Sequence, residues 1–263
     1  MSWLKPLGDT GLAVSALGLG TVKLGRDEGV KYPDRFTIPD DRAAAALLAQ
    51  ASELGVNLID TAPAYGNSEQ RLGHLLAGQR DRWIVCSKVG EEFENGQSRF
   101  DFSPEHTASS VERSLRRLQT DVIDLVLIHS DGDDLRIVNE LGTLQALGDL
   151  KRRGLIRAYG ISTKTVEGGV AAASQCDVVM LTYNLAQREE VAVLDACNTH
   201  NTGALIKKAL ASGHLQTNIE NPVQASMELI FSHPATSSAI IGTISPAHLE
   251  ANVLAAKQAL GAL

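Results

Sequence analysis

The segment Val56-Asn-Leu-Ile-Asp60-Thr-Ala-Pro63-Ala-Tyr65 indicates both the fold of this protein and the place of its functional site. Its first half is a short apolar strand, and the strand ends at the carboxylate of Asp60. A tight turn containing Pro63 follows and carries Tyr65 five positions beyond the aspartate. An unpaired charge at the end of a buried strand is costly, so Asp60 either caps the loop or has a functional partner. We expect Asp60 and Tyr65 to belong to one catalytic site.

Similar short apolar segments recur along the chain, and each is followed by a segment rich in helix-forming residues. The apolar segments do not alternate with polar residues, which is typical of parallel strands that are buried on both faces. We expect strands at 15–21, 56–60, 83–88, 123–128, 155–161, 177–181, 204–207 and 238–241. We expect helices at 41–54, 69–77, 104–118, 135–153, 164–174, 188–199, 222–232 and 246–260.

Eight βα units in a chain of 263 residues predict a closed (β/α)8 TIM barrel. An open doubly wound sheet is the alternative, but no Gly-x-Gly-x-x-Gly follows the first strand. Segment 4–14 combines glycines with alternating apolar residues, so we expect an N-terminal β-hairpin that plugs one end of the barrel. The sequence has no linker or break in composition, which predicts a single domain over residues 1–263.

The composition argues against several classes of protein. A formal net charge of −7 with scattered lysines and arginines predicts no nucleic-acid partner. No stretch has the length of a membrane span, and the N-terminus lacks the apolar core of a signal peptide. Cys86, Cys176 and Cys197 are interpreted as free thiols in a reducing compartment, and the dispersed histidines predict no metal site. We therefore expect a cytoplasmic monomer with no membrane partner.

Asp60, Lys88 and His129 end or directly follow three neighbouring strands of the predicted barrel. The C-terminal ends of barrel strands meet in one bowl, and adjacent strands lie about 4.8 Å apart. A lysine cation lowers the pKa of a nearby tyrosine such as Tyr65, the aspartate holds the lysine, and the histidine orients the substrate oxygen. This set suits protonation of an alkoxide that forms from a carbonyl group. It contains no nucleophile–base pair of the serine-hydrolase kind.

At these residues the chain resembles the aldo-keto reductase superfamily. The segments similar to the catalytic tetrad of that family occur in the family's order: Asp60-x-Ala62-x-x-Tyr65, Ser87-Lys88-Val89 and Leu127-Ile128-His129. The resemblance starts at Leu17-Gly-Leu-Gly-Thr21 and extends almost to the C-terminus, whose short final segment is similar to that of bacterial members. It implies a (β/α)8 barrel that binds extended NADP(H) without a Rossmann domain. It also implies that Tyr65 is the general acid/base, that Lys88 and Asp60 tune it, and that His129 orients the carbonyl.

The resemblance implies a set of residues that hold the cofactor: Thr21, Asp60, Ser162, Thr163, Met180, Lys207, Lys208, Ala209, Leu210, Ile241, Gly242, Thr243, His248 and Asn252. Thr163, Met180 and Lys207 depart from the family pattern, which has an asparagine, a glutamine and often an aromatic residue at these places. His248 and Ala251 replace the arginine and the glutamate of the adenine site, which weakens the case for a strong NADP preference. The two lysines at 207–208 would offset this by lying along the pyrophosphate, and we expect NADP(H) rather than NAD(H).

We therefore expect an NAD(P)-dependent oxidoreductase that acts on a small aldehyde, ketone or sugar. Two alternatives remain open: a Schiff-base lyase that uses Lys88 or Lys207, and a non-catalytic sensor of bound NADP(H), suggested by Met180 and Lys207. Segments 23–40 and 89–103 are expected to be long loops, of the kind that often form lids or binding loops. The sequence ends soon after the last helix, so we expect an open, permissive bowl with loop 23–40 as a partial lid.

Overall fold

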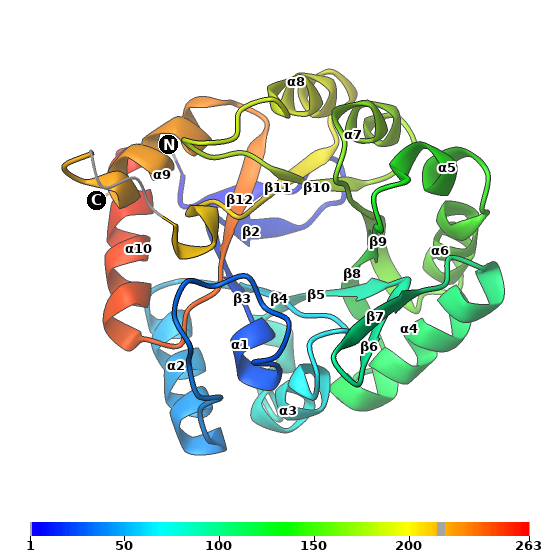
Figure 1. Ribbon diagram of the computed structural model, residues 1–263, viewed down its shortest axis with the longest axis horizontal. Coiled ribbons are helices and arrows are strands. Elements are labelled where there is room, and N and C mark those ends of the chain that lie inside the picture. Colours follow the sequence, from blue (N-terminus) through cyan, green and yellow to red (C-terminus); the bar gives the residue numbers. More distant parts are fainter. Residues whose placement is uncertain (1, 215–218, 263) are drawn as a thin grey trace.

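The computed structural model describes residues 2–214 and 219–262. Eight parallel strands close into a barrel in which strands that follow one another in the sequence lie side by side (Figure 1). The strands of the barrel are β3 Leu17–Gly20, β4 Leu58–Asp60, β5 Ile84–Val89, β8 Ile123–His129, β9 Ile156–Ser162, β10 Val178–Thr182, β11 Gly203–Lys207 and β12 Thr236–Ile241. The predicted (β/α)8 TIM barrel is therefore confirmed.

A ring of helices surrounds the barrel (Figure 1). Polar side chains start several of them: Ser103 accepts the backbone N–H of His106, and Ser245 accepts that of His248, each with a proline in the first turn. The helices are α1 Val22–Gly25, α2 Asp41–Glu53, α3 Ser68–Leu75, α4 Pro104–Leu118, α5 Asp134–Asn139, α6 Thr143–Arg152, α7 Val166–Ala173, α8 Val191–His200, α9 Pro222–Ser232 and α10 Pro246–Leu260.

The strands separate two apolar clusters. On β8, Leu125 and Leu127 belong to the cluster inside the barrel, whereas Val126 and Ile128 belong to the larger cluster between the strands and the helices. Successive side chains of a strand point to opposite faces, so every barrel strand except β3, which has glycines at two of its four positions, contributes to both clusters. Burial on both faces explains why these strands read as continuous apolar runs.

A two-stranded antiparallel hairpin, β1 Leu4–Pro6 and β2 Ala13–Ser15, precedes the barrel. Leu7 and Val14 are fully buried and belong to the cluster inside the barrel, together with Leu125 and Leu205. The hairpin thus closes the end of the barrel opposite the C-terminal ends of the strands, and the predicted plug is confirmed.

Three segments differ from the sequence-based expectation. Segment 89–103 is not a simple loop, because β6 Glu91–Glu94 and β7 Gln97–Phe100 form a hairpin around the left-handed turn Asn95-Gly96. The helix expected over 135–153 is split into α5 and α6 at Gly142, whose φ of 75° interrupts the helix. Segment 23–40 starts inside the short helix α1. Among residues 2–214 and 219–262, no helix is long and apolar enough to cross a bilayer.

Candidate active site

The alternation of side chains along the strands directs several polar residues into the mouth of the barrel. Leu58, Cys86 and Leu127 point to the barrel interior. Asp60, Lys88 and His129 each lie two positions further along the same strands and therefore share that direction. The same relation places Lys207 beyond Leu205 on β11, and Ser162 beyond Gly160 on β9.

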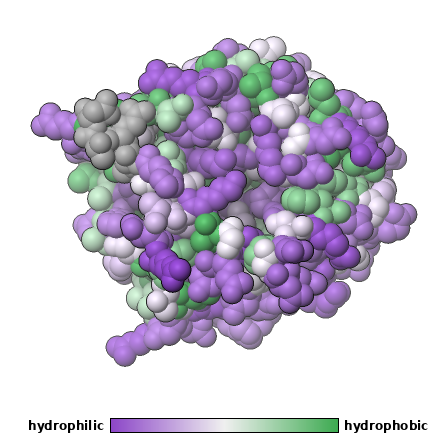
Figure 2. All heavy atoms as spheres, in the orientation of Figure 1, coloured by the Kyte–Doolittle hydropathy of each residue, from purple (hydrophilic) through white to green (hydrophobic). Residues whose placement is uncertain are grey.

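These residues line a cavity of about 590 Å³ at the C-terminal ends of the strands. Figure 2 shows this face of the molecule with mostly hydrophilic side chains and a depression near its centre. The cavity brings together Asp60, Tyr65, Lys88 and His129, as the sequence predicted. All the predicted cofactor residues also line it except Thr163, which is fully buried and bonds through its backbone N–H to the carbonyl of Met180.

Asp60 and Lys88 form a buried ion pair. Lys88 Nζ lies 2.5 Å from Asp60 Oδ1 and also donates to the carbonyl oxygen of Thr61 at 2.9 Å. The side chain of Lys88 is only 1% exposed and that of Asp60 only 5%. Burial lowers the pKa of Lys88, but the charge and hydrogen bond of Asp60, together with Tyr65 and Cys86, outweigh burial, and the net pKa is raised. Lys88 is therefore a fixed cation at neutral pH.

Tyr65 lies beside this cation, with Lys88 Nζ 4.7 Å from the centre of its ring. Complete burial raises the pKa of the Tyr65 hydroxyl, while Lys88 lowers it and Asp60 raises it. The net pKa is raised. The expected influence of Lys88 is present, but burial outweighs it, so Tyr65 is a protonated hydrogen-bond donor at neutral pH.

His129 has a carboxylate partner that the sequence did not indicate. His129 Nδ1 lies 2.6 Å from Glu91 Oε2, and the two side chains are 22% and 12% exposed. The His129 ring also meets the ring of Tyr65 edge-on, with centres 6.2 Å apart. Burial lowers the pKa of His129, Glu91 raises it, and Lys88 and Lys207 lower it, with a net lowering. His129 is thus mainly neutral at neutral pH.

On the opposite side of the cavity, Lys207 reaches from β11 to β9. Its Nζ donates to Ser162 Oγ at 2.9 Å and to the carbonyl oxygen of Thr163. Burial lowers the pKa of Lys207 to about 7, against the opposite influence of Glu190. An amine held to Ser162 therefore stands where the resemblance implies an aromatic residue in many family members, and Met180 also lines the cavity.

The far end of the cavity lies at the start of α10. Thr243 Oγ1 accepts the backbone N–H of Ser245, and the Ser245 hydroxyl caps the helix. His248 is exposed and Asn252 is buried, and both line the cavity. A helix start of this kind suits an anionic group such as phosphate.

Loop 23–40 crosses the cavity between its two sides. A side chain at Gly242 would meet the Tyr32 hydroxyl at 2.5 Å, and a side chain at Gly213 would meet Pro33 at 3.2 Å. Lys23 Nζ lies 3.8 Å from the centre of the Tyr32 ring, which orders this part of the loop. The expected partial lid is therefore present as a strap, Tyr32–Pro33, that rests on glycines of two other segments.

Among the residues at the site that reasoning from the sequence missed, Glu91 and Tyr32 matter most for its geometry. Both lie in segments that were expected to be irregular, 89–103 and 23–40. The Asn95-Gly96 pair is a recognised hairpin signal and could have placed Glu91 on a strand. No local signal points to Tyr32, because its contacts depend on the tertiary fold.

The fold and the residues at its mouth define a (β/α)8-barrel protein with an Asp–Lys–Tyr–His cluster beside an elongated cavity. The model of the aldo/keto reductase family matches residues 16–229, and the chain belongs to this family. A crystal structure of a Pseudomonas aeruginosa protein assigned to the aldo-keto reductases is 58% identical, covers 98% of this chain and 95% of its own, and has a TM-score of 0.90.

Two curated relatives are more distant. The aldo-keto reductase YhdN of Bacillus subtilis is 32% identical over 80% of this chain. The L-galactose dehydrogenase of Arabidopsis thaliana is 39% identical over 60% of this chain. The matched regions span 62% and 48% of the lengths of these two relatives.

Proposed function

We propose that this protein is an NAD(P)H-dependent oxidoreductase that transfers hydride between a nicotinamide ring and the carbonyl carbon of a small aldehyde, ketone or sugar. The observation that carries this proposal is the convergence of Tyr65, His129 and the Asp60–Lys88 pair on one cavity. Two hydrogen-bonding groups next to a buried cation suit the stabilisation of a developing alkoxide. The single-domain organisation, the monomeric state and the cytoplasmic location remain predictions.

The residues around the cavity fit a nicotinamide dinucleotide. Gly20 and Gly242 line the cavity without side chains, which leaves room for a ligand to approach the backbone there. Ser162 at one end offers a hydroxyl group, and the start of α10 at the other end suits a phosphate. Lys208 adds a cation beside the cavity. When bound, the dinucleotide supplies or accepts the hydride.

In this proposal each side chain of the cluster acts on the substrate oxygen or on Tyr65. Tyr65 donates its proton to the oxygen of the carbonyl as negative charge develops there. Lys88 stabilises the tyrosinate that remains, and Asp60 keeps Lys88 charged and in position. His129 makes the second hydrogen bond to the same oxygen and thereby orients the carbonyl group. The buried position of the ion pair strengthens these effects, because little water screens them.

We propose NADP(H) as the preferred cofactor and a sugar or a small aldehyde as the substrate. Lys207 and Lys208 favour the more highly charged dinucleotide. The name of one relative points to the other cofactor: a protein of Escherichia coli that is 29% identical over 81% of this chain is named an NADH-specific methylglyoxal reductase. L-galactose dehydrogenase, a sugar oxidoreductase by its name, supports the sugar class.

The test combines cofactor titration with turnover. Binding of NADPH and NADH is followed by protein fluorescence, and oxidation of the tighter-binding cofactor is measured across a panel of aldehydes, ketones and aldoses. We expect NADPH to bind more tightly and to be oxidised with at least one class of carbonyl. Binding without turnover over the whole panel would favour a sensor, and absence of binding would refute the proposal.

Lys207 motivates a second candidate, a Schiff-base enzyme. A lysine with its pKa lowered to about 7 is partly a free amine at neutral pH, and such an amine condenses with a carbonyl group with loss of water. Lys88 does not suit this role, since its pKa is raised. Borohydride trapping with a carbonyl substrate, followed by mass spectrometry, tests it. A protein of unchanged mass would dismiss this candidate.

A further inference from the structure

The short contact between Glu91 and His129 has a chemical consequence for the proposed reaction. An ionised carboxylate only accepts hydrogen bonds, and a ring nitrogen that carries a lone pair would repel it. Glu91 Oε2 and His129 Nδ1 are 2.6 Å apart, so a hydrogen atom has to lie between them. No hydrogen bond of good angle is formed at Nδ1 in the described structure. The contact is therefore short but bent.

Several groups keep Glu91 ionised and in place. Burial alone would raise the pKa of Glu91, but His129, the hydroxyl of Ser98 and the nearby charge of Arg26 outweigh burial and lower it to about 2. Ser98 Oγ donates to Glu91 Oε1 at 2.5 Å. Arg26 stacks on Phe93, with its guanidinium carbon 3.2 Å from the centre of the ring.

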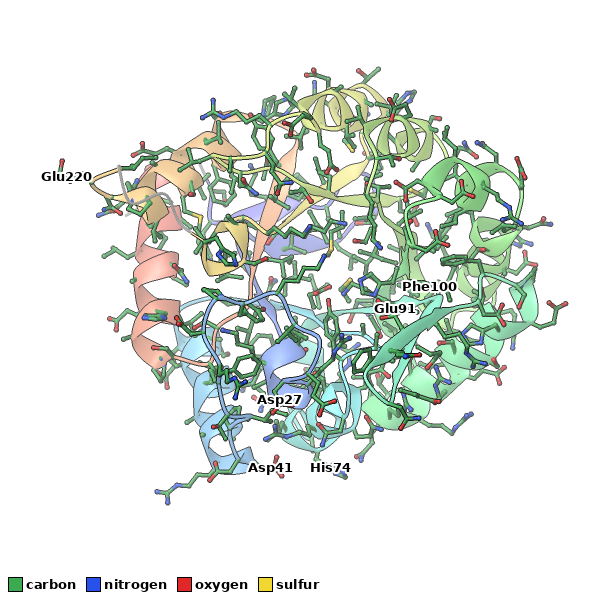
Figure 3. The ribbon with its side chains drawn as sticks, viewed as in Figure 1. Asp27, Asp41, His74, Glu91, Phe100 and Glu220 are labelled. Atoms are coloured by element: carbon green, nitrogen blue, oxygen red, sulfur yellow. The ribbon has the colours of Figure 1, made fainter. Side chains whose placement is uncertain are left out.

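The backbone aims Glu91 at His129. Gly90, between β5 and β6, has a φ of 98°, a conformation that glycine adopts without strain. A side chain at Gly90 would lie 2.5 Å from the ring of Phe102. Glu91 pairs with Phe100 at the base of the hairpin, and Figure 3 shows both side chains next to the mouth of the barrel. The sharp turn thus brings Glu91 to the imidazole.

We infer that Glu91 is a positioning residue that holds the proton of neutral His129 on Nδ1. Nε2 then carries a lone pair and accepts a hydrogen bond from an alcohol, but it cannot donate one to a carbonyl oxygen, which only accepts. A carbonyl substrate therefore needs a second proton on His129. Carbonyl reduction would use the imidazolium form, whereas alcohol oxidation would use the neutral form.

Protons and electrons balance in this scheme, which rests on the proposed function. Reduction adds one hydride, supplied by the reduced dinucleotide, and one proton. Tyr65 gives its proton to the substrate oxygen, and the His129 imidazolium restores it through the new hydroxyl group. His129 is left neutral, with Nε2 accepting a hydrogen bond from the product. Oxidation of the alcohol runs the same steps in reverse and returns the proton to His129.

The charges around His129 set the pH at which this change occurs. Glu91 of the hairpin favours the imidazolium, and Lys88 of β5 and Lys207 of β11 oppose it. Tyr65, which faces the ring edge-on, is neutral at these pH values. The net pKa of His129 is lowered, so it lies below the usual histidine value of about 6.5. As pH rises above this lowered pKa, the rate of reduction should fall by about tenfold per pH unit.

The experiment compares wild type, Glu91→Gln and Glu94→Gln. Glu94 lies on the same strand but is exposed, so Glu94→Gln removes the same charge as a matched control. Nitrogen-15 NMR of protein labelled at histidine reports the tautomer without any turnover, and a His129→Asn variant assigns the signal. At about pH 8 we expect His129 to be protonated at Nδ1 in wild type and in Glu94→Gln, and to shift toward protonation at Nε2 in Glu91→Gln.

The kinetic arm measures kcat/KM for reduction and for oxidation against pH at saturating cofactor. The amide introduced by Glu91→Gln can donate to Nδ1, so the neutral ring can donate from Nε2 to a carbonyl. In Glu91→Gln we expect the pH above which kcat/KM for reduction falls to rise by at least about one unit, because the fall then follows ionisation of Tyr65. In Glu94→Gln this pH should not change.

Two outcomes would overturn the inference. One is a wild-type His129 that is protonated at Nε2 at about pH 8, which is decisive even if Glu91→Gln does not fold. The other is a reduction profile with the same break in all three proteins. A wild type that binds no dinucleotide and reduces no carbonyl refutes the proposed function instead, and the tautomer measurement distinguishes that result from failure of the inference.

Discussion

Lys88 Nζ and the Asp60 carboxylate lie 2.5 Å apart with almost no exposure to solvent. The pair joins the ends of β5 and β4, which are neighbours in the barrel. Desolvation of two charges offsets much of their attraction, so a buried pair of this kind adds little net stability. Loss of one partner alone leaves an uncompensated buried charge, which is strongly destabilising. This small net stability agrees with the role that we propose for the pair beside Tyr65.

Removal of one partner of this pair should destabilise the protein, and removal of both should do so much less. We expect Lys88→Met and Asp60→Asn each to lower the free energy of unfolding by about 3–5 kcal/mol, and the double variant to recover a large part of the loss. Urea unfolding measures this. The exposed pair Arg152–Asp149 is the control, and Arg152→Met should cost less than about 1 kcal/mol. Additive losses at the buried pair would contradict the coupling.

Tyr65→Phe should abolish most turnover while the cofactor still binds. The variant removes only the hydroxyl group, so we expect kcat for carbonyl reduction to fall by about 10²–10⁴-fold. Fluorescence titration with NADPH should give a dissociation constant close to that of wild type. Tyr159→Phe is the control, since Tyr159 packs among the residues outside the barrel. A Tyr65→Phe variant with wild-type rates would refute the assignment of Tyr65.

Lys207 should make the affinity for oxidised cofactor depend on pH. Its pKa is lowered to about 7, so the side chain is a cation below that pH and loses its charge as pH rises through it. Its Nζ is bonded to Ser162, which lies at the end of the cavity opposite the proposed phosphate site, where the nicotinamide ring would bind in the proposed function. The oxidised ring is positively charged, so we expect NADP+ to bind more weakly as pH falls through about 7, with a smaller change for NADPH.

The measurement is calorimetric titration of both cofactor forms against pH. In Lys207→Met the pH dependence of the NADP+ to NADPH affinity ratio should largely disappear, because no charge is left to titrate next to Ser162. Lys208→Met is the control, as Lys208 is an exposed neighbour. If the ratio varies with pH in the same way in all three proteins, another group is responsible.

The strap Tyr32–Pro33 should slow the release of cofactor. Tyr32 packs against Gly242, and a side chain there would meet the hydroxyl at 2.5 Å. We expect both Tyr32→Ala and Gly242→Ala to raise the dissociation rate of NADPH by about tenfold, which corresponds to about 1.4 kcal/mol. Stopped-flow fluorescence measures the rate. Thr37→Ala, an exposed change on the same loop, should have no effect, and unchanged rates in Tyr32→Ala would exclude a role of the strap.

The barrel and the tetrad residues could be predicted because both depend on local patterns. A continuous apolar run that ends at Asp60 or His129 predicts a parallel strand and marks its C-terminal end. The hairpin 91–100 was missed, because Glu91, Glu92 and Glu94 are poor strand formers and outweighed the Asn95-Gly96 signal. The break between α5 and α6 was missed because a single glycine inside a helical pattern is often tolerated.

The electrostatics of the site could not be predicted from residue types. Lys88 does lower the pKa of Tyr65, as expected, but burial raises it by more, and the net pKa is raised. No local sequence pattern reveals how deeply Tyr65 is buried. Likewise, Glu91 and His129 are 38 positions apart in the sequence. Their contact exists because Gly90 turns the chain across the mouth of the barrel.

The hairpin β6–β7 connects β5 to α4, and it is not part of the closed ring of barrel strands. A different connection could therefore be grafted between β5 and α4 while every barrel strand keeps both of its neighbours. In the scheme that we propose, Glu91 of this hairpin sets the pH dependence, so the working pH would be a modular property, separable from the scaffold that carries Asp60, Tyr65, Lys88 and His129. Exchange of this one segment offers protein engineers a route to reductases and dehydrogenases with different pH optima on a common barrel.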